Sequence, residues 1–395
     1  MKRIKIADAS ADFTREPLVR KFGFKGGYLT ELWQSRVTLR SEDGTTGTGF
    51  GTQSVLWSDA SVFSGMSEED GNRLMFALTK FAAERLVGVS LETPLELIDG
   101  LYSSVLAEGR RLSQRESLRP TFALNALVAV DNAVWSLYGR ANGFSNLGDA
   151  VPAELRLGVP ACHDHCALIP LVSYNTPLDE VRRLADEGHF FFKIKIGHPG
   201  SQEEMLAKDC DRAAEIHDVL RSVRTGHTAT GKACYYFDAN GRYGDKETFM
   251  RFVAHLDRIG AREQTAIVEE PFEETDESRV DDIPLRIAAD ESAHTVEDAV
   301  RRMDLGYRAM ALKPIAKTMS LSLRVSAAAA ERGVPCFCAD LTVSPTLVEW
   351  NRAVARRLPQ FPGIGNLGLL ETNGEQNYLN WSRMSKSAPR EDVLW

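Results

Sequence analysis

Residues 192–197 read "FKIKIG", a run of strand-forming residues that carries two lysines. Side chains of an extended strand alternate between two faces, so Lys193 and Lys195 point to one side while Ile194 and Ile196 point to the other. Two ammonium groups held close together lower each other's pKa, and a lysine that loses its proton near neutral pH can act as a general base. The run is consistent with an edge strand bearing solvated lysines or with the wall of a site that moves protons.

The sequence around this run has the repeating strand-like and helix-like segments of a parallel barrel. From residue 168 onward, short β-rich runs recur and are mostly separated by helix-like segments. Eight such runs centre near residues 171, 193, 236, 268, 289, 312, 337 and 366. Repeated strand-helix units predict an α/β fold with a TIM-like barrel. The longest gap, after the second run, contains a predicted loop at residues 222–232.

Residues 1–150 have a different pattern, which predicts a compact α+β domain. Alternating apolar positions around "SEDGTTG" (41–47) predict two antiparallel strands joined by a hairpin. Ser67 is followed by acidic residues and helical apolar spacing, which predicts a helix start. A second, strongly apolar helix is predicted over residues 120–142, ending at Gly143.

Composition limits the class of protein and its partners. The chain has 395 residues, of which 43% are hydrophobic and 26% charged, as in a globular protein with a large domain and a smaller one. Its net charge of −8 and the absence of a basic run argue against nucleic acid and anionic membranes as partners. No apolar stretch is long enough to predict a signal peptide or a membrane span. We therefore expect a cytoplasmic protein that binds a small molecule.

The cysteines do not form the dense framework of a small secreted domain, so we expect reduced thiols. One local cluster, "ACHDHCALIP" (161–170), contains Cys162, His163, His165 and Cys166. Its spacing suggests a zinc knuckle, but no second half-site accompanies it. A polar linker with structural thiols is the preferred interpretation.

Charged residues collect where the predicted barrel strands end. One strand ends in "FDANG" with Asp238 and Asn240, the next in "VEEPF" with Glu269, and the next in "ADES" with Asp290 and Glu291. Reactive residues of such barrels lie at the C-terminal strand ends. Carboxylates gathered there would repel one another unless a hard cation with oxygen ligands joined them. The pattern predicts one Mg²⁺ site.

A further lysine follows the next strand, where "AMALKPIAKT" places Lys313 at the strand end. Lysines would then flank the metal from both sides. This arrangement suits removal of a proton from the carbon next to a carboxylate, because the cation stabilises the enediolate and either lysine can take or return the proton. Lys195 and Lys313 are the predicted bases, and Lys193 is expected to lower the pKa of Lys195.

The order "KIKIG", "FDANG", "VEEPF", "ADES" and "LKP" resembles the enolase superfamily, specifically the muconate lactonizing enzyme-like subgroup of the mandelate racemase/muconate lactonizing enzyme family. The resemblance covers about residues 168–370. It implies a modified TIM barrel of the (β/α)7β type with an α+β capping domain. The implied division is 1–150 for the cap, 151–370 for the barrel, and 371–395 for a segment that returns to the cap.

The resemblance also implies roles for individual residues. The metal ligands would be Asp238, Glu269 and Asp290, and the acid/base pair would be Lys195 and Lys313. Asn240 and Glu291 would contact these groups and hold them in position. The expected partners are Mg²⁺, a small carboxylic acid substrate and other copies of the chain in a homo-oligomer.

Some positions depart from relatives of this family. The aspartate and histidine of the mandelate racemase subgroup are missing, because Ile315 follows "LKP" and "VPCFCADL" contains no histidine. Where relatives usually have two glycines, this chain has Thr318 and Met319. After the seventh strand, Asp340 stands where members often carry specificity residues. Core packing is the expected role of Cys338 nearby.

Together these features predict a Mg²⁺-dependent enzyme that abstracts the proton α to a carboxylate. Its reaction would be racemisation, epimerisation or cycloisomerisation of a small carboxylic acid. An acid-sugar dehydratase is the alternative enzyme, since the same enediolate can expel a β-hydroxyl group. The alternative to an enzyme is a binding protein that retains the barrel and binds carboxylates without catalysing a reaction.

Overall fold

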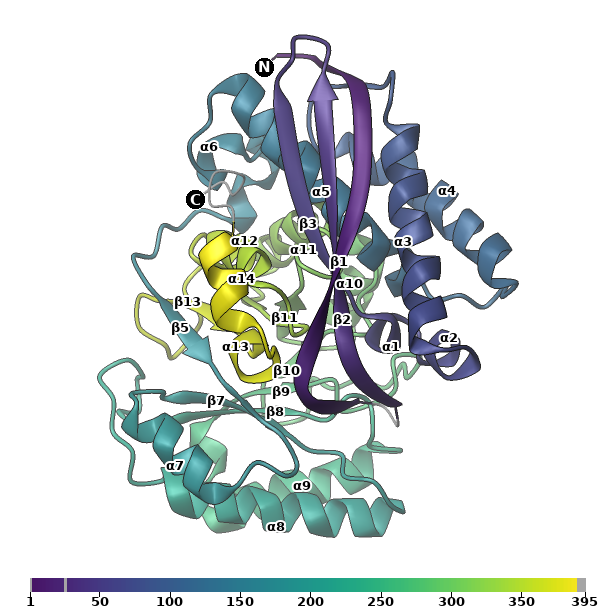
Figure 1. Cartoon of the computed structure of the whole chain (residues 1–395). Coiled ribbons are helices and arrows are strands. Elements are labelled where there is room, and N and C mark those ends of the chain that lie inside the picture. Colours follow the sequence, from purple (N-terminus) through teal and green to yellow (C-terminus); the bar gives the residue numbers. More distant parts are fainter. Residues whose placement is uncertain (1, 25–26, 389–395) are drawn as a thin grey trace.

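The computed structural model describes residues 2–24 and 27–388. Within these ranges the strands form two sheets (Figure 1). One is antiparallel, with strand order β3-β2-β1-β4, and is here called the cap sheet. The other is parallel, with order β5-β13-β12-β11-β10-β9-β8-β7-β6, and is here called the barrel sheet. None of the helices in the described part combines the length and apolar character needed to cross a membrane.

The cap sheet contains the predicted hairpin. Its strands are β1 (Ile4–Phe24), β2 (Gly27–Ser41), β3 (Thr46–Gln53) and β4 (Ser90–Leu91). The turn between β2 and β3 is closed by a hydrogen bond from Ser41 N to Thr45 O of 2.9 Å, and Gly44 adopts a φ of +85° that favours glycine. The antiparallel pair predicted around residues 41–47 is confirmed.

Helices pack against the cap sheet, and both helix predictions for this region are confirmed. The helices are α1 (Val55–Ser58), α2 (Ala60–Gly65), α3 (Glu68–Arg85), α4 (Glu96–Ser113) and α5 (Pro120–Asn142). Helix α3 begins at Ser67, whose hydroxyl accepts a hydrogen bond from Asp70 N. Helix α5 ends at Gly143, which has a φ of +70°.

Helix α5 lies directly on β3 because glycines leave no side chains between them. Gly47, Gly49 and Gly51 alternate along β3 and face α5. A Cβ atom added at Gly49 would lie 2.1 Å from both Ala129 O and Ala133 N, which are backbone atoms of the helix. The alternating glycines therefore set the distance between helix and sheet.

The barrel sheet confirms the predicted fold class and corrects one strand. Its strands are β5 (Cys166–Ile169), β6 (Leu171–Val172), β7 (Phe191–Lys195), β8 (Cys234–Asp238), β9 (Thr265–Glu269), β10 (Ile287–Ala289), β11 (Ala309–Leu312), β12 (Cys336–Cys338) and β13 (Gly368–Glu371). The predicted strand near residue 171 is split at Pro170, which has no N–H to continue a ladder. Its first half pairs with β13 and its second half with β7, so the barrel closes through this one segment.

Helices cover the outside of the barrel and connect most successive barrel strands, whereas β9 and β10 are joined by a segment without a helix (Figure 1). The helices are α7 (Leu178–Asp186), α8 (Gln202–Leu220), α9 (Lys246–Ile259), α10 (Val296–Asp304), α11 (Met319–Glu331) and α12 (Pro345–Ala355), preceded by α6 (Leu147–Ala150) at the end of the cap region. Residues 222–232 form the predicted loop, in which Arg224 and Lys232 make an isolated β-bridge.

The chain returns to the first strand after the barrel. Helices α13 (Gly374–Asn377) and α14 (Trp381–Ser387), yellow in Figure 1, lie next to the long strands of the cap sheet. Glu16 of β1 accepts a hydrogen bond from Asn380 at 3.0 Å and pairs with Arg383 at 2.9 Å. The division into 1–150, 151–370 and 371–395 stays a prediction, and residues 389–395 lie outside the described ranges.

The Cys/His cluster at 161–170 is held by hydrogen bonds. His163 Nδ1 lies 2.7 Å from Asn366 Oδ1 and its Nε2 lies 2.9 Å from Leu358 O, so both ring nitrogens are engaged. Cys162 is exposed, whereas Cys338 of β12 is fully buried as a free thiol. Among the described residues no group at this cluster is arranged to hold a metal ion.

We predict that Gly49→Ala destabilises the protein by about 3 kcal/mol, because the new methyl group would overlap the backbone of α5 and force helix and sheet apart. Urea denaturation measures the decrease in the free energy of unfolding. The control is Gly100→Ala in the exposed interior of α4, where an added Cβ meets nothing within 4 Å and alanine favours the helix. Equal stabilities of the two variants would contradict this account of the packing.

A second prediction concerns pH and Asp131 of α5, which is buried against α11. Asp131 accepts hydrogen bonds from Ser320 N at 3.1 Å and Ser320 Oγ at 2.5 Å, but burial raises its pKa from 3.8 to about 6. The folded protein holds this proton more tightly, so the contribution of Asp131 to stability falls as pH rises from about 4 to 6. The free energy of unfolding of wild type minus that of Asp131→Asn should therefore fall by about 3 kcal/mol over this range. Above it, this difference should stay level. Urea denaturation at successive pH values tests this, and a constant difference would refute it.

Candidate active site

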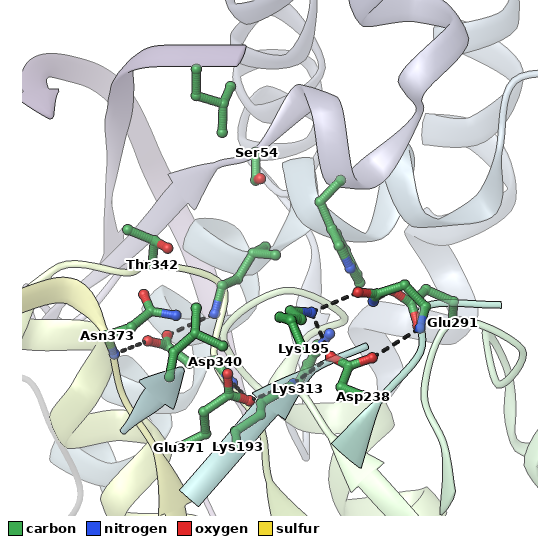
Figure 2. Close-up of a pocket in the computed structure, with 15 residues that line it drawn as sticks. Ser54, Lys193, Lys195, Asp238, Glu291, Lys313, Asp340, Thr342, Glu371 and Asn373 are labelled. Carbon is green, nitrogen blue, oxygen red and sulfur yellow. Dashed lines mark hydrogen bonds and ion pairs between the residues drawn. The ribbon is translucent and has the colours of Figure 1, made fainter. Parts of the chain in front are cut away.

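The two lysines of β7 point into the mouth of the barrel, as predicted from their spacing (Figure 2). Both approach the same oxygen, Asp238 Oδ2, which lies 3.0 Å from Lys193 Nζ and 2.5 Å from Lys195 Nζ. They differ in depth. The side chain of Lys193 is 3% exposed, whereas that of Lys195 is 15% exposed and lies nearer the cap.

Lys193 lies among carboxylates, and this overturns one expectation. Its Nζ is 3.0 Å from Glu371 and 3.3 Å from Glu269 in addition to Asp238, and it lies 4.7 Å from the centre of the Tyr236 ring. Burial lowers the pKa of Lys193, but the surrounding negative charges outweigh burial and raise this pKa well above its ordinary value. The prediction that the paired ammonium groups lower each other's pKa is therefore wrong for Lys193, because its charge is compensated.

A hydrogen-bonded chain fixes the outer lysine. Lys195 Nζ donates to Asn240 Oδ1 at 2.7 Å, and Asn240 Nδ2 donates to Glu291 Oε1 at 3.1 Å. Asn240 has a φ of +45°, a left-handed conformation that asparagine tolerates better than most residues. The sequence-predicted Asn240 and Glu291 thus contact each other and hold the side chain of Lys195 through one amide.

The acidic strand ends meet in the barrel, as Figure 2 shows for Asp238 and Glu291. Asp238 and Glu269 are direct partners in the ladder between β8 and β9. Oxygen atoms of Glu269, Asp290 and Glu291 lie within 4.8 Å of one another, and all three residues are buried. Burial, reinforced by the charge of Asp238, raises the pKa of Glu269 well above its ordinary value. The described structure therefore buries several carboxylates close together, and its lysines do not fully neutralise their charge.

These acids fit a hard divalent cation. Glu291 Oε2 is buried and has no hydrogen-bond partner among the described residues. Unpaired buried carboxylate oxygens are costly, and an ion that prefers oxygen ligands removes that cost. Asp238 lies outside this closest group, and its Oδ2 is engaged by two lysines. A cation bound there would have to compete with these ammonium groups.

Two lysines contact Asp290 from the opposite side. Lys313 follows β11 and forms an ion pair with Asp290 Oδ2. Lys317 Nζ lies 3.3 Å from Asp290 Oδ1 and donates to Asp290 O at 2.5 Å and to Ala293 O at 3.0 Å. Burial lowers the pKa of Lys313, but Asp290 and the neighbouring acids raise it to a net value above the ordinary one. Lys313 is therefore charged while this pairing lasts.

The turn that carries Lys317 is strained. Thr318 stands where relatives were expected to have glycine, and it has a φ of +74°, a genuine outlier for a β-branched residue. Its hydroxyl accepts a hydrogen bond from Leu321 N and begins helix α11. Fixing this conformation places the ammonium group of Lys317 against the backbone and side chain of Asp290.

The cap region closes the pocket from above. Leu29, Ser54 and Trp57 line it together with the barrel residues, and Lys313 Nζ lies 4.8 Å from the centre of the Trp57 ring. The cavity that remains has a volume of about 60 Å³. Ion pairs between lysines and acids fill most of the mouth, so a cation and a substrate must displace some of these pairs.

Asp340 lines the same pocket but serves the neighbouring loops. Its Oδ1 accepts a hydrogen bond from Leu341 N at 2.7 Å, and its Oδ2 accepts one from Asn373 N at 2.7 Å. Asp340 N donates to Glu371 Oε2 at 3.1 Å. Burial, together with the charge of Glu371, raises the pKa of Asp340 to about 7. The residue ties together the loops that follow β12 and β13.

Sequence reasoning missed several residues of this site. Glu371 had the same signal as the predicted ligands, since it is a carboxylate at the end of a barrel strand. Lys317 lies four residues after Lys313, but only the folded turn brings both ammonium groups to one carboxylate. Trp57 belongs to the cap, and no local pattern indicated that it would lie over Lys313.

Comparison with known proteins finds a family model that matches the barrel region of the chain. Residues 177–365 match the model of the family described as Enolase C-terminal domain-like. A search of curated proteins found no match.

Solved structures extend the likeness to nearly the whole chain. Similar structures include 2-chloromuconate cycloisomerase from Rhodococcus opacus 1CP, with a TM-score of 0.66 and 19% identity over 96% of this chain and 90% of that one. A dipeptide epimerase from Methylococcus capsulatus, in complex with Mg, has a TM-score of 0.61 and 20% identity over 95% and 92% of the chains. A dipeptide epimerase from Enterococcus faecalis V583, in complex with Mg and L-Leu-L-Tyr, has a TM-score of 0.65 and 15% identity over 99% and 96%. We conclude that residues 177–365 are similar to the Enolase C-terminal domain-like family and that the chain has the same fold as solved structures described as mandelate racemase/muconate lactonizing enzymes.

Proposed function

We propose that this chain is a Mg²⁺-dependent enzyme that removes and returns the proton on the carbon next to a substrate carboxylate. The observation that carries this proposal is the placement of Lys195 and Lys313 in one pocket beside a cluster of crowded carboxylates. The outcome would be racemisation, epimerisation or cycloisomerisation of a small carboxylic acid. The dipeptide epimerases and the cycloisomerase among the structural neighbours support this class of reaction.

The order of strands supports a mechanism with two opposed bases. Lys195 ends β7 and Lys313 follows β11. Between these strands the sheet order contains three strands in one direction, and in the other it contains β12, β13 and the split pair of β5 and β6. In a closed barrel such positions lie across the mouth from each other. A substrate carbon held between them would present one face to each lysine.

The proposed Mg²⁺ ligands are Asp238, Glu269 and Asp290. They end or follow three neighbouring strands, and the raised pKa of Glu269 reflects burial and the nearby charge of Asp238. When bound, the ion supplies positive charge next to the substrate carboxylate and so favours loss of the adjacent proton. Glu291, whose Oε1 accepts from Asn240, adds an oxygen to the same cluster.

The lysines of this chain have separate tasks in the proposal. Lys195 and Lys313 move protons, one on each face of the substrate carbon. Both are paired with proposed ligands in the described structure, so cation binding would release them from Asp238 and Asp290. Lys193 balances the acids below Lys195, and Lys317 holds Asp290 in place.

The ligand assignment predicts that Asp238→Asn and Asp290→Asn each weaken Mg²⁺ binding by more than about tenfold, because each variant loses an anionic oxygen ligand. Isothermal titration calorimetry with MgCl₂ measures the affinity. Asp340→Asn is the matched control, since it removes a buried carboxyl group from the same pocket outside the cluster, and its affinity should match wild type. If Glu291→Gln abolishes binding while Asp238→Asn retains it, the ligands are Glu269, Asp290 and Glu291 instead.

The two-base mechanism predicts a stereochemical difference between lysine variants in D₂O. Lys313→Met should stop deuterium exchange at the α-carbon of one enantiomer and preserve exchange in the other, and Lys195→Met should show the mirror pattern. Proton NMR of a panel of paired enantiomers, including dipeptides of the kind bound by the Enterococcus relative, measures the exchange.

Lys317→Met is the matched control for this experiment. Lys317 is also buried and also contacts Asp290, but it does not line the pocket, so its loss should slow exchange of both enantiomers alike. A strongly unequal pair, in which one lysine is dispensable for exchange, would favour a cycloisomerase or an acid-sugar dehydratase. Unchanged exchange in both Lys195→Met and Lys313→Met would refute the mechanism.

A further inference from the structure

A second hollow lies at the end of the barrel opposite the proposed active site. Its volume is about 510 Å³, and it is lined by residues that precede or begin β9, β10 and β11. Thr265 is the first residue of β9, whereas Glu269 at the other end of that strand belongs to the acidic cluster. Four residue steps along a strand span roughly 13 Å, so the two sites are separate.

A half-buried arginine lines this hollow. Arg286 immediately precedes β10. Its guanidinium group forms no hydrogen bond or ion pair with any residue in the described ranges. It lies over the ring of Phe361, with Cζ 5.1 Å from the ring centre. A guanidinium group held by its face keeps its N–H edges available, and these edges suit an oxyanion.

A second arginine adds positive charge at the same place. Arg308 immediately precedes β11, donates to Asp281 O at 3.0 Å, and lines the hollow with Arg286. Burial and the nearby charge of Arg308 lower the pKa of Arg286, so the two cations repel each other. Asp281 does not relieve this, because its carboxylate is paired with Arg279.

The other charged residues of the lining do not neutralise this pair. Arg262 is paired with Asp257, outside the lining. Glu263 lines the hollow but forms no ion pair with Arg286 or Arg308 in the described structure. The hollow therefore combines a preorganised guanidinium group, an uncompensated positive charge and enough room for a small ligand.

We propose that this hollow binds a phosphate-type oxyanion, held between Arg286 and Arg308. Arginine forks match the geometry of phosphate oxygens and bind them through paired N–H groups. The site is independent of the proposed reaction, because the strands separate it from the lysines and acids of the mouth. Occupation would join the starts of β10 and β11, whose other ends lead to Asp290 and Lys313.

The test is calorimetric titration of inorganic phosphate into the metal-free protein at constant ionic strength, maintained with chloride because salt screens exposed charges. Wild type should show saturable binding at one site. Arg286→Met and Arg308→Met should each weaken the affinity at least tenfold. Arg286→Lys keeps the charge but not the fork, so its affinity should lie between those of wild type and Arg286→Met.

Two matched variants identify where the phosphate binds. Arg182→Met removes the same charge from an exposed position on α7 and should bind phosphate like wild type. Lys195→Met removes a cation from the proposed active site and should also bind like wild type. Arg308 is exposed, so its variant remains informative even if Arg286→Met folds poorly.

Several results would overturn the proposal. No specific site exists if wild type shows no saturable phosphate binding. The same conclusion follows if Arg182→Met and Arg286→Met lose phosphate affinity equally. Binding that survives Arg286→Met and Arg308→Met but disappears in Lys195→Met would place the anion in the other pocket. A change of oligomeric state in Arg286→Met, with phosphate affinity unchanged, would show that the arginines face another copy of the chain.

Discussion

The ammonium group of Lys193 is the interaction on which the barrel mouth depends. It contacts carboxylates that end β8, β9 and β13, and so links strands from both sides of the point where the barrel closes. Burying several acids together is unfavourable unless a cation compensates them, and removing one partner from a buried ion network costs far more than an exposed pair contributes. The positive charge of Lys193 thus allows several carboxylates to stay buried together at these strand ends.

Local rules predict much of this arrangement. The period of two along a strand placed Lys193 and Lys195 on one face, and both approach Asp238. Strand ends in a parallel barrel share one rim, so the sequence alone predicts that Asp238, Glu269 and Asp290 lie near one another. The hairpin at 41–47 and the helix that ends at Gly143 followed from turn and capping chemistry.

The remaining features depend on contacts between distant segments. The charge state of Lys193 could not be predicted from its neighbour alone, because Glu371 lies 178 residues away in the sequence. Lys317 acquires its role from a turn that holds Thr318 at a φ of +74°, which no propensity favours. Trp57 lies in α1, far from Lys313 in the sequence, and reaches it only in the folded protein. Tertiary packing, rather than pattern, determines each of these positions.

The split at Pro170 has a consequence for association between molecules. Sheets that end in unpaired strands offer backbone N–H and C=O groups to other chains, and closing a sheet removes this hazard. Here β5 and β6, the terminal strands of the barrel sheet, belong to one continuous segment, so the seam is covalent. Of the two sheets in the described ranges, the cap sheet therefore keeps the open margins, at β3 and at the short β4. Backbone pairing between copies of this chain would form along β3, where helix α5 covers one face but not the rim, or along the part of β1 beyond Lys5, because β4 pairs only with Ile4 and Lys5.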